Sequence, residues 1–142
     1  MKEKILRINT AKRKSQKDSV PETWQHLGGR GLLACILVDE VPATCEPLGA
    51  KNKLIFAPGL MVGHRLSSCD RISIGGKSPL TGGVKEANAG GTTGLAIAQL
   101  GIKAIILEDK PINDAWQIIH ISAEGVKFES ADELIGMGVY ET

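Results

Sequence analysis

The chain has 142 residues, of which 42% are hydrophobic and 23% charged, and its formal net charge is +1. This length and composition suit one compact domain, and the near-neutral charge gives no electrostatic footprint for nucleic acid. No apolar run approaches 18 residues, and no hydrophobic signal region follows the first residues, so we expect no membrane span and a soluble, cytoplasmic protein.

The N-terminal segment predicts a β-hairpin. Residues 4–8 and 15–20 flank a turn at Lys12 and Arg13. Seven of the 17 basic residues lie in the first 17 positions. This density indicates a solvated hairpin, and a surface that docks on an acidic partner is the alternative.

The rest of the chain predicts short helices and strands. Helices are expected at residues 30–38, before Pro42, and at residues 95–101, where Gly101 is the C-terminal stop. A third helix is expected to start at residues 130–135. Strands are expected at residues 53–57, 71–75, 83–87 and 103–108, and a second hairpin at residues 116–121 and 125–129. About eight strands with three short helices predict an α+β domain with antiparallel or mixed sheets.

One glycine-rich run is the most informative part of the sequence. Seven of the 17 glycines lie between Gly75 and Gly94, interleaved with Ser, Thr and Asn. Glycine allows a positive φ and a close approach of the backbone to a ligand, and the helix start that follows suits phosphate. A pair of tight turns in an ordinary sheet is the alternative.

Two common phosphate-binding motifs do not fit. Residues 76–78 resemble the end of a P-loop, but Arg71 stands where its first glycine should be, and Pro79 stands where its helix should begin. Residues 29–34 satisfy the dinucleotide fingerprint G-x-G-x-x-A, but residues 24–27 before them do not form a buried strand.

Residues 71–82 and 87–91 resemble the N-terminal domain of the tungsten-containing aldehyde ferredoxin oxidoreductases. The specific signal is an Arg followed by K-S-P-L-T-G and then A-N-x-G-G at these spacings. Weaker similarity extends to residues 27–32, 52–57 and 100–106. The resemblance therefore covers nearly the whole chain.

The resemblance implies that the chain is the base for a tungsten (or molybdenum) bis-pyranopterin cofactor. Arg71 resembles the arginine between the pterin and an iron–sulfur cluster, and its five fixed donors suit that position. Asn88 resembles the residue whose backbone carbonyl helps to bind a magnesium ion between the pterin phosphates. Ala89, Gly90 and Gly91 are implied to border the cofactor, with Gly90 in backbone contact.

Residues 57–70, which lead to Arg71, follow the family pattern only loosely. The substrate preference of known members is therefore not carried over to this chain. A surface ion pair with Asp70 or Glu86 is the alternative role for Arg71. His64 and Arg65 are candidates to face the site, although a loop His beside an Arg is more often solvated.

The cysteines limit what this chain can bind. Cys35, Cys45 and Cys69 are 10 and 24 residues apart, whereas a cubane cluster needs four thiolates, usually with some in close spacing. Cys35 is expected in the core, and Cys69 beside the cofactor. A 4Fe-4S cluster is therefore expected only in other domains.

The implied activity is oxidation of an aldehyde to a carboxylic acid, with electrons passing through the cluster to ferredoxin. No catalytic residue is assigned, because the family's acid–base residues lie in other domains. We expect residues 1–142 to be this N-terminal domain truncated at its C-terminus, completed by missing domains or a separate subunit. The alternative is a non-catalytic module that binds a phosphorylated ligand or a partner subunit.

An exposed apolar sheet face is expected around Ile72, Ile74 and Val84, because cofactor and later domains would cover it in the family. Such a surface predicts self-association of the chain into a homo-oligomer.

Overall fold

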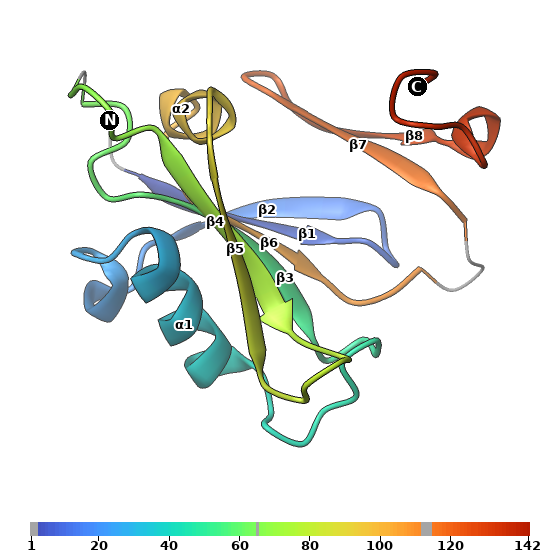
Figure 1. Ribbon diagram of the computed structural model, residues 1–142, viewed down its shortest axis with the longest axis horizontal. Coiled ribbons are helices and arrows are strands. Elements are labelled where there is room, and N and C mark those ends of the chain that lie inside the picture. The colour runs from blue at the N-terminus through green and yellow to red at the C-terminus, as the bar shows by residue number, and fades with distance from the viewer. Residues whose placement is uncertain (1–2, 65, 112–114) are drawn as a thin grey trace.

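A six-stranded mixed β-sheet forms the centre of a computed structural model that describes residues 3–64, 66–111 and 115–142 (Figure 1). The strands lie in the order β2-β1-β6-β3-β4-β5. Their bounds are β1 Lys4–Asn9, β2 Lys14–Ser19, β3 Lys53–Pro58, β4 Arg71–Lys77, β5 Val84–Gly90 and β6 Ile102–Glu108. Neighbouring strands are antiparallel except β1 and β6, which are parallel. The predicted α+β class and the N-terminal hairpin are confirmed.

The two faces of the sheet have different covers. Helix α1 (Gly29–Glu40) packs on one face. Helix α2 (Thr93–Gln99) and the hairpin of β7 (Gln117–Ser122) and β8 (Gly125–Ser130) lie on the other side (Figure 1). No helix in the described part of the chain is long and apolar enough to cross a membrane.

Helix α1 forms because its apolar residues recur at helical spacing. Leu32, Leu33 and Ile36 are fully buried against the central strands. Burial of each such side chain contributes roughly 1.5–3 kcal/mol. The helix ends as predicted, since Val41 is extended and the following Pro42 disfavours a helical conformation at that position.

The second face is more completely covered than predicted near α2. Ile72 is only 3% exposed, because Ile97 of α2 packs in the same apolar cluster. The expectation that Ile72 awaits a later domain is therefore wrong. Val84 is 59% exposed, but it pairs with Lys77 and lies on the face toward α1, so its expected grouping with Ile72 and Ile74 is wrong. On the second face, Ile74 is half-buried. The open apolar surface thus begins beyond α2, toward the turn between β4 and β5.

Strand β5 is longer than predicted. The sequence predicted a strand at residues 83–87, whereas β5 continues to Gly90. Its pairing with β4 continues through two further residue pairs, Ile72 with Ala89 and Arg71 with Gly90. Part of the predicted glycine-rich loop is therefore sheet.

The predicted C-terminal helix is wrong. The structure has only a 3-10 turn at Asp132–Leu134, preceded by Ser130, whose hydroxyl accepts a hydrogen bond from the Asp132 N–H at 3.2 Å. A helix this short needs tertiary packing to persist, and Ile135 beside it is 52% exposed.

An ionic cluster joins β1, β2, β3, β6 and the last residue of α1. Arg7 contacts Asp18, Glu40 and Glu108 at 2.5–2.8 Å, and Lys53 contacts Glu40 and Glu108 at 2.5 and 2.8 Å. Partial burial alone would raise the pKa of Glu40, but the hydrogen bonds from Arg7 and Lys53 outweigh it and lower that pKa. Strand β2 is exposed except at Asp18, as predicted for a solvated hairpin, whereas Arg7 of β1 is half-buried in the ionic cluster.

Candidate functional site

The β4–β5 hairpin brings two residues of the predicted site together. Arg71 opens β4 and lies directly opposite Gly90, the last residue of β5. The guanidinium extends over Gly90, since a Cβ atom there would lie 3.2 Å from Nη1 of Arg71. Only glycine leaves this space free. The pair therefore presents a five-donor fork beside an exposed stretch of backbone.

The backbone of Asn88 faces away from the sheet at its free edge. Antiparallel strands alternate between residue pairs that exchange backbone hydrogen bonds and pairs that do not. Ser78 N donates to Gly83 O at 2.7 Å, and the alternation from that rung makes Ser73 and Asn88 a pair of the second kind. Because β5 is the edge strand, the Asn88 carbonyl points outward, where an acceptor is available to a ligand.

A polar cluster lies behind this edge, between β5 and α1. Asn88 Nδ2 donates to Ser73 Oγ at 3.2 Å, and Arg30 of α1 pairs with Glu86 Oε2 at 3.2 Å. The Ser73 hydroxyl and, more weakly, the Arg30 guanidinium hold the pKa of Glu86 below its ordinary value. The other oxygen, Glu86 Oε1, is buried and has no hydrogen-bond partner among the described residues. Sequence analysis missed Ser73 and Arg30; the only signal was a polar residue between Ile72 and Ile74.

The alternative role for Arg71 is not supported. Glu86, one proposed ion-pair partner, pairs with Arg30 instead, and within the described ranges no ion pair involves Arg71. The guanidinium is therefore available to a ligand.

The end of β5 and its connection to α2 contain the other residues expected to border the cofactor, residues 89–91, here called the cradle. Gly91 has φ of +109°, and no atom lies within 4 Å of a Cβ built there. Ala89 and Gly90 before it are exposed. Helix α2 is confirmed, but it begins at Thr93 and ends at Gln99, two residues earlier at each end than the predicted 95–101. The residues 89–91 thus form an open backbone surface without large side chains.

The K-S-P-L-T-G part of the motif lies at the opposite end of the hairpin. Residues 77–82 run from the last residue of β4 into the turn before β5, and they lie away from residues 89–91. Lys77 Nζ donates to the carbonyls of Ala43 and Cys45, and the Ser78 hydroxyl accepts from the turn backbone. This half of the motif therefore fixes the hairpin and does not reach Arg71.

The remaining predicted residues lie outside this cluster. Cys35 is half-buried against the core, as expected, and Cys45 is buried in a loop. The Cys69 thiol contacts the Leu66 and Met61 carbonyls at 3.1 and 3.4 Å. His64 is exposed, and Arg65 lies outside the described residues. The described ranges contain no group of three His, Cys, Asp or Glu residues that could bind a metal.

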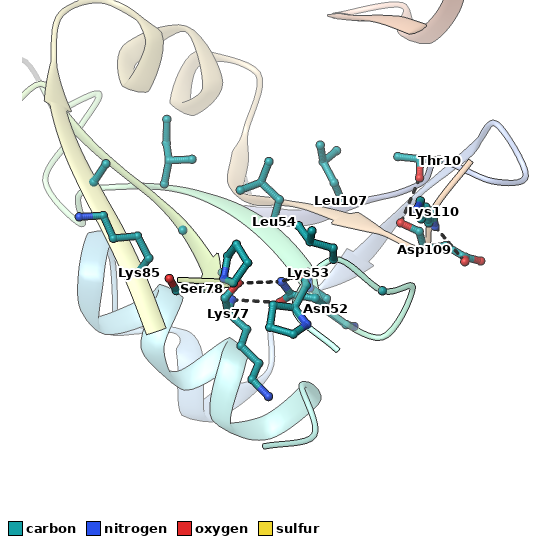
Figure 2. A pocket seen from close by; sticks show the side chains of 18 of the residues that line it. Thr10, Asn52, Lys53, Leu54, Lys77, Ser78, Lys85, Leu107, Asp109 and Lys110 are labelled. Atoms are coloured by element: carbon teal, nitrogen blue, oxygen red, sulfur yellow. Dashed lines mark hydrogen bonds between the residues drawn. The ribbon is translucent and has the colours of Figure 1, made fainter. Parts of the chain in front are cut away.

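An apolar trough of about 560 Å³ lies on the sheet face opposite α1. Its floor includes Leu54, Ile74, Ala87 and Leu107, and Lys85 lies at one side. Leu54 and Leu107 are cross-strand partners that project from the same side of the sheet (Figure 2). The trough is the part of the expected apolar face that this chain leaves open.

The whole described arrangement corresponds to one known domain. Residues 5–142 match the family "Aldehyde ferredoxin oxidoreductase, N-terminal domain", and the chain belongs to this family. It is 32% identical to the tungsten-containing aldehyde ferredoxin oxidoreductase of Pyrococcus furiosus and 35% identical to that of Pyrococcus horikoshii. Each match covers 98% of this chain but only 23% of the relative. The chain thus spans about a quarter of the length of these enzymes.

A solved structure shows the same fold in a different enzyme. The chain superposes with a TM-score of 0.89 and 29% identity on a chain of the "Active site complex BamBC of Benzoyl Coenzyme A reductase in complex with 1,5 Dienoyl-CoA". The match covers 97% of this chain and 21% of the other. The domain architecture is therefore common to proteins named for two different reactions.

Proposed function

We propose that this chain is the cofactor-supporting domain of a tungsten or molybdenum bis-pyranopterin oxidoreductase. Asn88 would bind magnesium through its backbone carbonyl, and Arg71 would donate to the pterin or its phosphates. Ala89, Gly90 and Gly91 would approach the cofactor through their backbone.

The observation that carries this proposal is the Arg71–Gly90 pair beside the outward carbonyl of Asn88. A guanidinium suits phosphate oxygens, and magnesium prefers oxygen ligands. Side chains are absent where a diphosphate would approach, at Gly90 and Gly91. The donors, the acceptor and the free space therefore fit the group that the family implies.

The proposed reaction is oxidation of aldehydes to carboxylic acids, with electrons passing through a 4Fe-4S cluster to ferredoxin. When bound, the metal–pterin group supplies the redox chemistry. This chain's part is to bind and orient that group. The cluster ligands and the acid–base residues are assigned to further domains or to a separate subunit.

A non-catalytic role is the second candidate. The chain spans about a quarter of its relatives, and its fold also occurs in the BamBC complex. Both observations are consistent with a module that binds a phosphorylated ligand or a partner subunit. Analysis of metal and pterin content in the complex purified from its native cells separates the candidates, since the module would carry neither.

Magnesium diphosphate is a direct probe of the cradle. In an NMR titration of the chain, the Gly90 and Gly91 amide signals should shift with saturation. Gly90→Val should abolish the shifts, because its side chain would displace the Arg71 guanidinium. Gly83→Val is the matched control, since a Cβ at that glycine meets only Thr81 Oγ1, at 3.7 Å. Unshifted signals in the unmodified chain, or equal binding by both variants, would refute the proposed cradle.

A further inference from the structure

We infer that Ser73 is a positioning residue, which orients the Asn88 carbonyl toward a magnesium–diphosphate ligand by holding the Asn88 side chain. The inference rests on the proposed function. It assigns to the Asn88 amide the role of an anchor, whereas the ligand is the backbone oxygen of the same residue.

Ser73 is unusual among the residues under α1. It is 1% exposed in a strand whose neighbours, Ile72 and Ile74, are apolar. Burial of a hydroxyl is unfavourable unless the group is hydrogen-bonded. Ser73 Oγ accepts a hydrogen bond from Asn88 Nδ2 at 3.2 Å, and the same hydroxyl lowers the pKa of the neighbouring Glu86 carboxylate. The buried hydroxyl therefore has a partner that belongs to the candidate site.

The register explains why this side-chain contact matters. Ala87 and Ala89 are on rungs where β5 exchanges backbone hydrogen bonds with β4. Asn88 lies between them on a rung without such bonds, so its backbone is not fixed by β4 directly. Pairs on these rungs have the closest side chains, which allows the bond between Asn88 and Ser73 to replace the missing backbone link.

The geometry also separates the two polar groups of Asn88. Its side chain is on the α1 face, bonded to Ser73, while its carbonyl points outward in the plane of the sheet. On the same face, the next rung carries Glu86, which Arg30 of α1 holds at 3.2 Å. The inward side of the edge strand is thus fixed to β4 and α1, which leaves its outward side for a ligand.

A double-mutant cycle on the chain tests this role with magnesium diphosphate as the probe. Ser73→Ala should weaken binding about three- to tenfold, the loss expected for one neutral hydrogen bond. Asn88→Ala should weaken it by a similar factor, because the carbonyl remains but its anchor is lost. The double variant should bind no more weakly than Asn88→Ala, because Ser73 is inferred to act on the ligand through Asn88 and not through its other neighbour, Glu86. Hydrogen exchange of the amides at residues 88–91 should accelerate in all three variants without ligand.

Ser78→Ala is the matched control. Ser78 is 6% exposed, belongs to the same hairpin and accepts hydrogen bonds from two turn amides. Loss of these hydrogen bonds should lower the midpoint temperature of thermal unfolding. The affinity for magnesium diphosphate should stay within twofold of that of the unmodified chain.

The possible failures are distinguishable. Absence of binding by the unmodified chain overturns the proposed function and this inference with it. Binding by the unmodified chain with equal affinity in Ser73→Ala overturns the inference alone. Additive losses in the double variant, or an equal affinity loss in Ser78→Ala, would also overturn it, since either result means general destabilisation.

Discussion

The two ends of the β4–β5 hairpin lie about 20 Å apart and have similar residues, rich in Gly, Ser, Thr and Asn. At the turn end, the polar groups are bonded to one another. The Asn52 side chain makes four hydrogen bonds with backbone groups of Pro47, Lys53 and Lys77. The Lys77 ammonium is bonded to two further carbonyls.

At the other end, the Arg71 guanidinium makes no ion pair with the described residues, although the Asn88 side chain is bonded to Ser73. The Arg71 guanidinium lies over Gly90, the Asn88 carbonyl points outward, and a Cβ atom at Gly91 would meet no atom within 4 Å. The comparison teaches that composition alone does not identify a binding loop. What distinguishes the ends is whether the donors and acceptors already have partners within the chain.

Gly75→Val should give the largest effect, because this glycine lies between the two ends. A Cβ there would lie 2.2 Å from the Lys85 carbonyl oxygen and 3.1 Å from Leu33 Cδ1. We expect a loss of about 3 kcal/mol in the free energy of unfolding, measured by urea denaturation. Probe binding should fall too, because β5 must separate from β4. Near-normal stability would show that the close pairing of β4 and β5 at Gly75 is not needed to hold the two ends of the hairpin.

Asn52→Ala should loosen the turn end alone. Four hydrogen bonds are lost and several backbone groups lose their partners, so the free energy of unfolding should fall by about 2–3 kcal/mol. The affinity for magnesium diphosphate at 25 °C should not change. A parallel loss of affinity would contradict the separation of the two ends.

Arg71→Ala should give the opposite pattern. The side chain is exposed and makes no ion pair in the described part of the chain, so unfolding should change by less than about 0.5 kcal/mol. Loss of a charge-assisted contact costs about 1.5–3 kcal/mol, so probe affinity should fall at least roughly tenfold. Isothermal titration calorimetry measures the change, with Lys85→Ala as the control for loss of a surface charge. Equal affinities in the two variants would contradict the role of the guanidinium.

Lowering the pH should destabilise the fold near the turn end of the hairpin, where α1 ends at Glu40 in the ionic cluster. The pKa of Glu40 is lowered by folding from an ordinary value of 4.5, so its contribution is complete above that pH and is lost as the pH falls below it. Glu40→Gln should therefore cost about 1 kcal/mol at pH 7 and much less at pH 3, by urea unfolding at each pH. A cost independent of pH would exclude this carboxylate as the cause.

Several strands were predictable from local patterns: apolar and polar residues alternate at the start of β4, and β6 is a mostly apolar run that follows Gly101. The order of the strands was not, since β6 pairs with β1 from the far end of the sequence. The helix predicted to start at residues 130–135 had a local start signal, but its apolar residue Ile135 is 52% exposed and packs against little. The burial of Ile72 was not predicted, because the residue that covers it, Ile97, lies on a separate helix, α2.

The site was predictable only in part. Once β4 and β5 are a hairpin, Arg71 and Gly90 must meet, because a hairpin brings its outer ends together. The same geometry places residues 77–82, at the middle of the continuous motif, farthest from Arg71. The Arg30–Glu86 pair joins residues 56 positions apart and depends on how α1 packs, which no local pattern encodes.

The central place of β6 has a consequence for how the protein is made. This strand lies between β1 and β3, so it joins the β1–β2 hairpin to the β3–β4–β5 meander. During synthesis both units leave the ribosome first, as separate pieces with open edges. The sheet closes only when residues 102–108 emerge, and the long loop between β1 and β6 must then be closed at an entropic cost. Insertion of β6 is therefore expected to limit the folding rate. Until then, the β1–β2 hairpin and the β3–β4–β5 meander are the parts most exposed to aggregation.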